Sequence, residues 1–243
     1  MTVDYILQGA AAQFRAQNGV GPNDPIRFKS LVLKLGVMAM FKPLSEKFSG
    51  MAIKNSSFRC MLINSNHRVS KQHFTIAHEL YHLFIQNDFT SEVSTAGMFD
   101  KTDKNEYNAD RFAAYLLMPE EGVISLIPAN ELSKNKVTLP TIVKIEQYFA
   151  CSRISVLFRL SEIGLIDYSR YKSLTENVKQ TAMLLGYNGD LYDPGNHNLV
   201  ITNYGAKAKG LYDREIISES HFISLMGDIG IDITNFASGD EQE

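Results

Sequence analysis

The chain has 243 residues, of which 44% are hydrophobic and 21% are charged, and its formal net charge is −3. This length allows one large domain or two small ones, and the composition is typical of soluble globular proteins. The charge excludes an overall basic character of the kind that binds nucleic acid or membrane surfaces, so such a partner would need a local patch.

Nothing in the sequence predicts export or a disulfide framework. No run approaches the ~20 apolar residues that span a bilayer, and the first residues, "MTVDYILQGAAAQFRAQNG", lack the basic start and apolar core of a signal peptide. The two cysteines, Cys60 and Cys151, are far apart in the sequence, which favours reduced thiols. We therefore expect a cytoplasmic protein with no membrane partner.

The first 70 residues predict a helix, a hairpin and a loop. Apolar residues at helical spacing favour a helix over residues 3–17, which "GVGPNDP" at 19–25 ends. Two β-prone runs at 51–55 and 58–64 are separated by two serines and predict a hairpin. A loop then leads to Ser70, which we expect to cap the next helix.

The next predicted helix, at about 71–86, contains the segment "FTIAHELYHLF". His78 and His82 are four residues apart, so their imidazoles project from one face of that helix. Imidazole is a zinc ligand, and Glu79, about 100° round the helix from His78, can take a proton from a metal-bound water and pass it to a leaving amine. His-Glu-x-x-His on a helix is the signature of zinc peptidases. The alternative, two ordinary core or surface histidines, is disfavoured because burying Glu79 without a partner or metal would be costly.

A third ligand is expected from a second predicted helix, at about 103–117. A catalytic zinc usually has three protein ligands and one open position for water. Glu106 and Asp110 are again four residues apart. We expect Glu106 to bind zinc and Asp110 to accept a hydrogen bond from the distal nitrogen of a liganding histidine. The alternative interpretation of this pair is the solvated acidic edge of an amphipathic helix.

The segment "FTIAHELYHLF" followed by "EYNADRFAAYLLMP" resembles the ImmA/IrrE family of zinc metallopeptidases over residues 74–119. The resemblance implies that His78, His82 and Glu106 hold Zn²⁺ as the cofactor and that Glu79 is the general base.

Two positions depart from the family pattern. Tyr81 occupies a position where glycine is usual, and His73 one where arginine is common. Neither change removes a ligand. We expect Tyr81 to narrow the approach to the site or to cover a neighbouring element.

The resemblance also implies a function. Members of the family are cytoplasmic, are often encoded in prophages, other mobile elements or stress loci, and cleave or inactivate helix-turn-helix repressors of the XRE type, so that genes are derepressed. Many carry a repressor-like DNA-binding domain fused upstream. Only about 70 residues precede the active-site helix here, so we expect the repressor to be a separate protein.

Further along, the sequence predicts a helix–turn–helix pair with helices at about 139–149 and 153–163. Seven basic residues and three acidic ones lie within 133–172, a modest patch that could contact DNA or the substrate repressor. The basic residues are Lys134, Lys136, Lys144, Arg153, Arg159, Arg170 and Lys172. The alternative, which we favour, is that the pair packs on the peptidase and completes its core.

The pattern as a whole predicts an α+β fold: a mostly helical, zincin-like metallopeptidase domain with a small β-sheet, followed by a helix-turn-helix-like region. We expect a peptidase domain at 1–127, the helical module at 128–172 and a C-terminal region at 173–243 without a recognisable motif. That region contains weak helical patterns at 205–214 and 218–227, and its last residues, "SGDEQE", are expected to be a frayed tail.

The predicted function is zinc-dependent endoproteolysis of a separate helix-turn-helix repressor. The strand at 58–64 comes just before the active-site helix, where an edge strand would hold an extended substrate. His67 or Tyr115 could stabilise the oxyanion. The two rival functions are sequestration of a repressor without cleavage and DNA-binding regulation through residues 139–163. An intact Glu79 argues against sequestration, because binding alone needs no general base.

Overall fold

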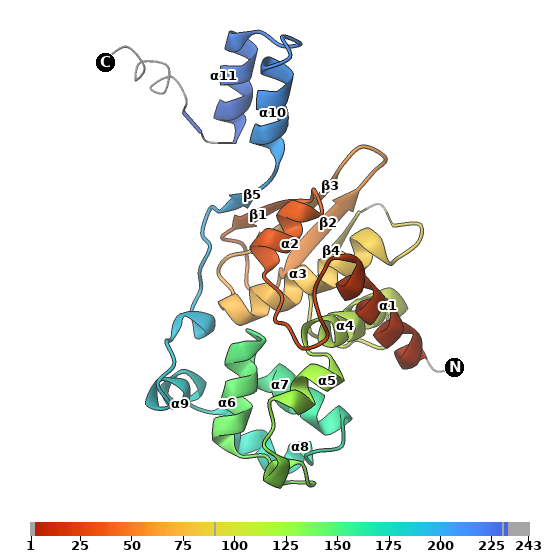
Figure 1. The fold of residues 1–243 in the computed structure, drawn as a ribbon, viewed down its shortest axis with the longest axis vertical. Coiled ribbons are helices and arrows are strands. Elements are labelled where there is room, and N and C mark those ends of the chain that lie inside the picture. Colours follow the sequence, from red (N-terminus) through yellow and green to blue (C-terminus); the bar gives the residue numbers. More distant parts are fainter. Residues whose placement is uncertain (1–2, 90, 230, 233–243) are drawn as a thin grey trace.

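The computed structural model describes residues 3–89, 91–229 and 231–232. Its architecture is α+β, as the sequence predicted: helices α2 (Phe28–Lys34) and α3 (Val69–Phe84) lie against a five-stranded sheet (Figure 1).

The sheet has the strand order β4-β2-β3-β1-β5. The strands are β1 (Met38–Lys42), β2 (Gly50–Lys54), β3 (Arg59–Asn64), β4 (Ser91–Ser94) and β5 (Val200–Ile201). β2 and β3 form the predicted hairpin, β1 is parallel to β3, and β5 is antiparallel to β1. The expectation that the strand at 58–64 is an edge strand is wrong, because β3 is hydrogen-bonded on both sides, to β2 and to β1. The strand at this edge of the sheet is β4, which pairs with β2.

Helix α3 is the central helix of the fold. Twelve of its sixteen residues are buried, so this helix is enclosed on nearly every side, between β2 and β3 and helix α4 (Lys104–Leu117). It begins at Val69, and the expected cap at Ser70 is wrong: Ser70 lies inside the first turn and is buried. The N–H of Val69 instead donates to the carbonyl of Asp193, so a distant loop satisfies the helix end.

Helix α4 begins where its sequence predicts, because Asp103 caps it. The Asp103 side chain accepts hydrogen bonds from the backbone N–H groups of Asn105 and Glu106, at 2.9 and 3.1 Å. The buried face of α4 packs against α3 and against helix α1 (Val3–Gln17). These contacts fix α4 beside the histidines of α3.

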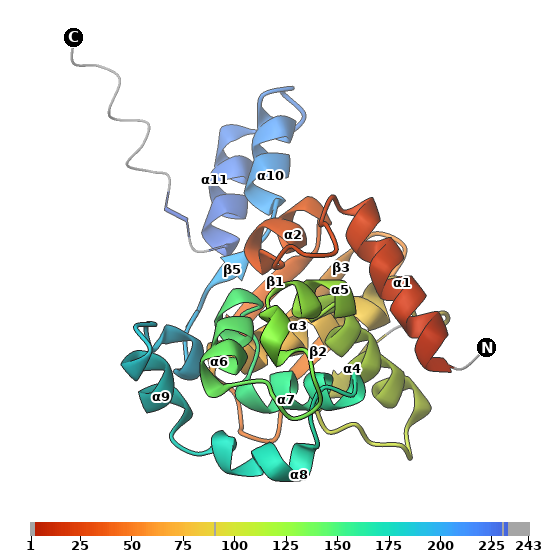
Figure 2. The same ribbon diagram turned by 60° about the horizontal axis from the view of Figure 1, so that its bottom comes forward.

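The chain then forms a group of shorter helices below the sheet in Figure 1, seen from beneath in Figure 2. They are α5 (Glu120–Ser125), α6 (Leu139–Tyr148), α7 (Arg153–Glu162), α8 (Tyr168–Tyr171) and α9 (Val178–Leu184), with 3₁₀ turns at Ala129–Glu131, Lys172–Thr175 and Asp190–Tyr192. Ile142 and Leu160 of the predicted helical pair belong to the same apolar core as Leu80 of α3. The pair therefore packs into the core, while the proposed division into three regions stays a prediction.

The basic patch expected at 133–172 is smaller than its sequence suggests. Arg153 and Arg159 are buried: Arg153 Nε donates to Glu146 Oε2 at 2.6 Å, and Arg159 Nε donates to the carbonyl of Met118 at 3.0 Å. Two of the seven basic side chains therefore make their hydrogen bonds inside the fold and cannot reach DNA.

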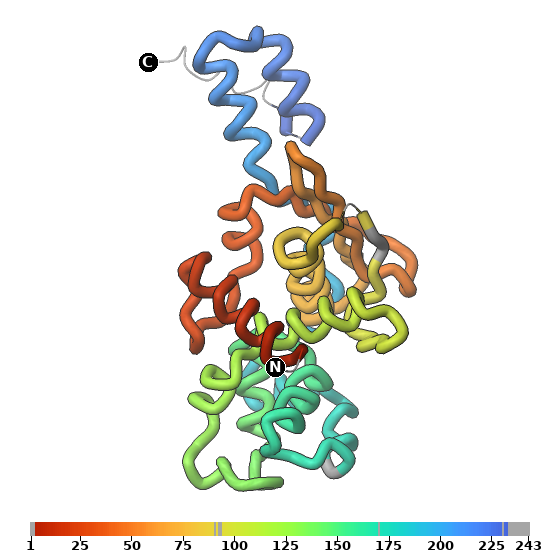
Figure 3. The backbone as a smooth tube through the Cα atoms, turned by 90° about the vertical axis from the view of Figure 1, so that its right-hand side faces the viewer, coloured from red at the N-terminus to blue at the C-terminus, as the bar shows by residue number. Residues whose placement is uncertain are grey.

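Beyond β5 the chain forms a hairpin of two helices, α10 (Tyr204–Tyr212) and α11 (Glu219–Asp228), close to the two weak helices predicted there. This hairpin stands away from the rest of the molecule (Figures 1 and 3). The predicted tail "SGDEQE" lies outside the described residues. Among the helices that the structure describes, none has the length and apolarity to cross a membrane.

Candidate metal centre

The packing of α3 on α4 brings the three expected ligands together. The Nε2 atoms of His78 and His82 are 3.1 Å apart. Glu106 faces both, with Oε2 at 3.3 Å from His78 Nε2 and Oε1 at 3.1 Å from His82 Nε2. One ligand atom from each of the three residues lies within 4.8 Å of the others.

These separations fit a tetrahedral metal. Bonds of about 2.0–2.1 Å at tetrahedral angles place neighbouring ligand atoms about 3.3 Å apart, which is close to the observed distances. The Nδ1 atoms of His78 and His82 face the acceptor oxygens of Asp110 and Gln86, so each ring can direct an Nε2 lone pair at the shared point. Two imidazoles and a carboxylate are a donor set that suits zinc.

The cluster attracts positive charge. Burial alone would lower the pKa of His78, but its hydrogen bonds to Asp110 and Glu106 outweigh burial and raise that pKa to about 10. Burial would raise the pKa of Glu106, yet its hydrogen bonds with His78 and His82 lower it to about 2. In the metal-free protein a proton is therefore held at this point, where a metal ion would replace it.

Each histidine has a partner at its distal nitrogen. Asp110 Oδ1 lies 2.8 Å from His78 Nδ1, as expected from the spacing on α4. The Asp110 carboxylate also accepts hydrogen bonds from the backbone N–H groups of Gly97 and Phe99, both at 2.7 Å. The partner of His82 was not predicted from the sequence. Gln86 Oε1 lies 2.5 Å from His82 Nδ1, and the i,i+4 spacing of the two residues was the signal that could have found it.

Glu79 is fully buried beside the cluster, and burial raises the pKa of its carboxyl group. Its Oε1 accepts a hydrogen bond from Ser94 of β4, whereas its Oε2 is buried with no hydrogen-bond partner within the described structure. Ser94 was also missed, because it lies in a segment too polar and irregular to predict a strand.

The sequence model described as the IrrE N-terminal-like domain, peptidase family M78, matches residues 32–161. The chain belongs to this family. The match covers more than half of the chain and includes α3, α4, α6 and all but the last residue of α7. Among proteins of curated function, none matches the chain with statistical significance. The predicted ImmA/IrrE membership is thus confirmed, and the protein is a metallopeptidase.

The two departures from the IrrE-like pattern have structural roles. Tyr81 is buried, with its ring against Phe112 of α4 and edge-on to His82 at 5.5 Å, so it covers a neighbouring helix. His73 packs against Phe28 of α2, and its Nδ1 lies 3.1 Å from the carbonyl of Ala150. Neither residue displaces a member of the cluster.

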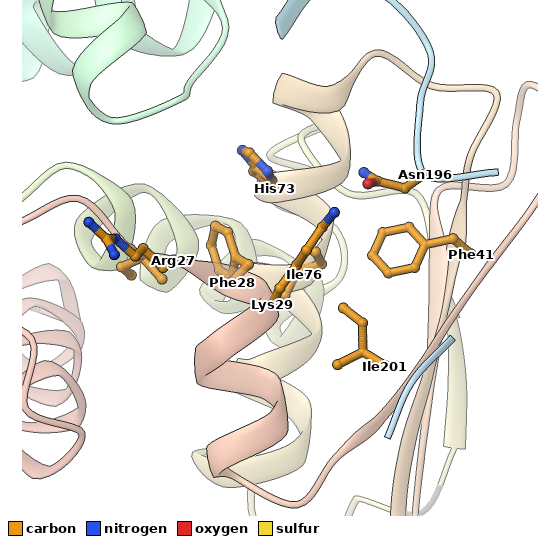
Figure 4. Close-up of a pocket in the computed structure, with 9 residues that line it drawn as sticks. Arg27, Phe28, Lys29, Phe41, His73, Ile76, Asn196 and Ile201 are labelled. Carbon is orange, nitrogen blue, oxygen red and sulfur yellow. The ribbon is translucent and has the colours of Figure 1, made fainter. Parts of the chain in front are cut away.

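A cavity of about 270 Å³ lies elsewhere on α3 (Figure 4). Phe28 and Lys29 of α2, Phe41 of β1, and His73 and Ile76 of α3 line it, but no residue of the metal cluster does. The three expected ligands and Glu79 lie in a more enclosed place. His78, Glu79 and His82 are fully buried, while the Glu106 side chain is 18% exposed and marks the side open to solvent.

The two side chains considered for the oxyanion have other contacts. Tyr115 is buried against the guanidinium groups of Arg111 and Arg159, at 4.8 and 4.9 Å from its ring. The Nε2 atom of His67 lies 2.9 Å from the carbonyl of Glu46. A role of either residue at the oxyanion stays a prediction.

Proposed function

We propose that this metallopeptidase holds Zn²⁺ at His78, His82 and Glu106 and cleaves peptide bonds with Glu79 as the general base. The observation that carries this proposal is the convergence of three donor atoms at tetrahedral spacing, with a buried carboxylate next to them. When bound, Zn²⁺ supplies a Lewis acid that polarises the scissile carbonyl and acidifies water.

The residues of the chain divide the remaining work. Glu79 Oε2, which has no partner in the described residues, takes the proton of the attacking water and then delivers it to the leaving amine. Asp110 and Gln86 keep the two imidazoles oriented through their Nδ1 atoms. The enclosure of Glu79 excludes bulk water from the base.

The substrate segment binds along β4. This strand is hydrogen-bonded to β2 on one side, and its other side forms the edge of the sheet. An extended peptide can add to that edge through its main chain, which brings a peptide bond beside Ser94 and Glu79. The requirement for an extended segment favours limited cleavage in linkers and loops.

The proposed substrate is a separate helix-turn-helix repressor of the XRE type, cleaved in the cytoplasm to derepress genes of a mobile element or a stress response. Membership of the family supports this assignment. The described residues before α3 form α1, α2 and β1–β3 and contain no repressor-like unit of their own. The helical pair α6–α7 would help to hold the repressor.

The test is to incubate the purified, zinc-loaded protein with the repressor encoded beside it. We expect a few discrete fragments, abolished by a chelator and by Glu79→Gln, which retains the size of the side chain but not the base. That variant should keep its zinc and lose roughly 10²–10⁴-fold in rate. Wild-type turnover by Glu79→Gln would refute the mechanism.

The same experiment separates the rival functions. A repressor that stays whole but releases its operator would indicate sequestration. A shift of operator DNA by the peptidase alone, at physiological salt, would indicate DNA binding through residues 139–163, a function that the burial of Arg153 and Arg159 disfavours.

A further inference from the structure

Ser94 lies at the junction of the general base and the edge strand. It is the last residue of β4, 1% exposed, and pairs in register with Gly50 of β2. Its hydroxyl contacts two acceptors, Glu79 Oε1 and, at 3.2 Å, the carbonyl of Gly50. Through its side chain, therefore, the strand at the edge of the sheet contacts a catalytic group on α3.

The local backbone makes room for this contact. A Cβ atom at Gly50 would lie 2.7 Å from Glu79 Oε1 and 2.5 Å from Cγ2 of Thr75, which is closer than real Cβ atoms approach. The absence of a side chain at position 50 lets the Glu79 carboxylate lie directly against β2 and reach Ser94. The contact between Glu79 and Ser94 thus depends on the missing side chain of Gly50 in β2 and on the hydroxyl group of Ser94 in β4.

The two oxygens of Glu79 are in different situations. Oε1 is held by Ser94, and Oε2 is buried with no partner in the described part of the chain. A carboxylate anchored at one oxygen cannot rotate freely, so the other oxygen is kept in one direction. Without this hydrogen bond, only the packing around the buried Glu79 side chain would fix the direction of its carboxylate.

We propose that Ser94 is a positioning residue for the peptidase reaction: its hydroxyl anchors Oε1 of Glu79 to β4, so that Oε2 is presented to the attacking water. This inference rests on the proposed role of Glu79. Because β4 is also the proposed substrate edge, the anchor fixes the base to the strand along which the substrate peptide would lie.

The first test measures kcat and KM separately on a peptide that the wild-type protein cleaves, chosen from a mixed peptide library by mass spectrometry. Ser94→Ala should lower kcat roughly 10- to 100-fold, the value of a hydrogen bond to a charged group, with KM and zinc content unchanged. Ser94→Thr, which keeps the hydroxyl, should recover most of kcat. Ser70→Ala, which removes a buried serine from the far end of α3, is the matched control and should keep wild-type kcat.

The second test does not depend on turnover. Benzohydroxamate chelates zinc and gives up a proton, which Glu79 can accept. Calorimetric titration of the zinc-loaded protein should show that Ser94→Ala weakens its binding when Glu79 is present and has no further effect in the Glu79→Gln background. Equal weakening in both backgrounds would mean that Ser94 only supports the fold, and would overturn the inference.

The two proposals can fail separately. If Glu79→Gln cleaves as the wild type does, the proposed function falls and Ser94 loses its role with it. If Glu79→Gln is inactive while Ser94→Ala keeps wild-type kcat, the inference about Ser94 alone is wrong.

Discussion

Two helix pairs of this peptidase bury charge, with different results. Between α3 and α4, two imidazoles and the carboxylate of Glu106 face one shared point, 3.1–3.3 Å from each other. Between α6 and α7, the buried groups are opposite in charge and contact each other directly, with Arg153 Nε 2.6 Å from Glu146 Oε2. The remaining nitrogens of Arg153 donate to Leu174 and Thr181.

The difference distinguishes a candidate metal-binding site from an ion pair that only stabilises the fold. Arg153 and Glu146 neutralise each other, and Arg153 also links α7 to the residues around α9. The charges of this pair are therefore satisfied inside the fold. His78, His82 and Glu106 are arranged so that a cation can be shared by all three. Convergence on a point, rather than burial of charge as such, is the feature that indicates a ligand.

Removing Glu106 should have the largest effect on the α3–α4 cluster. Glu106→Ala should reduce bound zinc from about one ion per chain to near none and abolish proteolysis, because two imidazoles alone hold zinc weakly. The protein should still unfold cooperatively. Elemental analysis and a urea melt measure the two effects, and full zinc occupancy would show that the third ligand lies elsewhere, with Asp110 the next to test.

The converse change is Arg153→Ala. It should cost about 3–5 kcal/mol in the free energy of unfolding, because the buried Glu146 is left without its counter-charge, while zinc content and activity per folded molecule stay unchanged. Lys134→Ala is the matched control, since its ion pair with Asp167 at 2.9 Å is exposed and should contribute less than about 1 kcal/mol. A loss of zinc in Arg153→Ala would contradict the separation of the two regions.

A smaller effect is expected at the outer partners of the histidines. Asp110→Asn should lower zinc affinity roughly 10- to 100-fold, and Gln86→Leu should lie near the lower limit of that range. The reason for the difference is charge: Asp110 is an anion that also holds the backbone of Gly97 and Phe99, whereas Gln86 is neutral. Competition against a coloured chelator measures both, and a larger effect at Gln86 would reverse this ranking.

A pH dependence of the metal-free protein is also expected. The pKa of His78 is raised from 6.5 to about 10, so the folded state binds a proton that the unfolded state releases. The stabilisation that this proton gives to the folded state is fully present below pH 6.5 and is lost as the pH rises through about 10. Urea midpoints of the metal-free protein should therefore fall over this interval, and less steeply in Asp110→Asn. A urea midpoint that does not change over this pH interval would contradict the raised pKa of His78.

The part of the site that the sequence predicted lies on two helices. The spacings of His78 and His82 and of Glu106 and Asp110 are local, and helical geometry converts such a spacing directly into a shared face. The family match supports the same region. The helices α1, α4, α6 and α7 were predictable for the same reason, since their apolar faces repeat with the helical period.

What the sequence could not predict depends on contacts between distant segments. Ser94 lies in a strand of four residues that, within the described part of the chain, pairs only with β2, about 40 positions earlier, so no local pattern marks it. The helix end at Val69 is set by the carbonyl of Asp193 rather than by Ser70. The interior place of β3 was missed because β1, its second neighbour, precedes the hairpin and pairs in parallel.

The shortest strand of the sheet has a protective consequence. β5 is only two residues long, yet it covers the outer side of β1 with antiparallel pairing of Ala39 to Ile201 and Met40 to Val200. An uncovered β1 would present a row of unpaired N–H and C=O groups to other copies of the chain, which is a route to edge-to-edge aggregation. Because this cover arrives more than 150 residues after the strand it protects, newly made chains carry an exposed sheet edge until the rest of the molecule has folded.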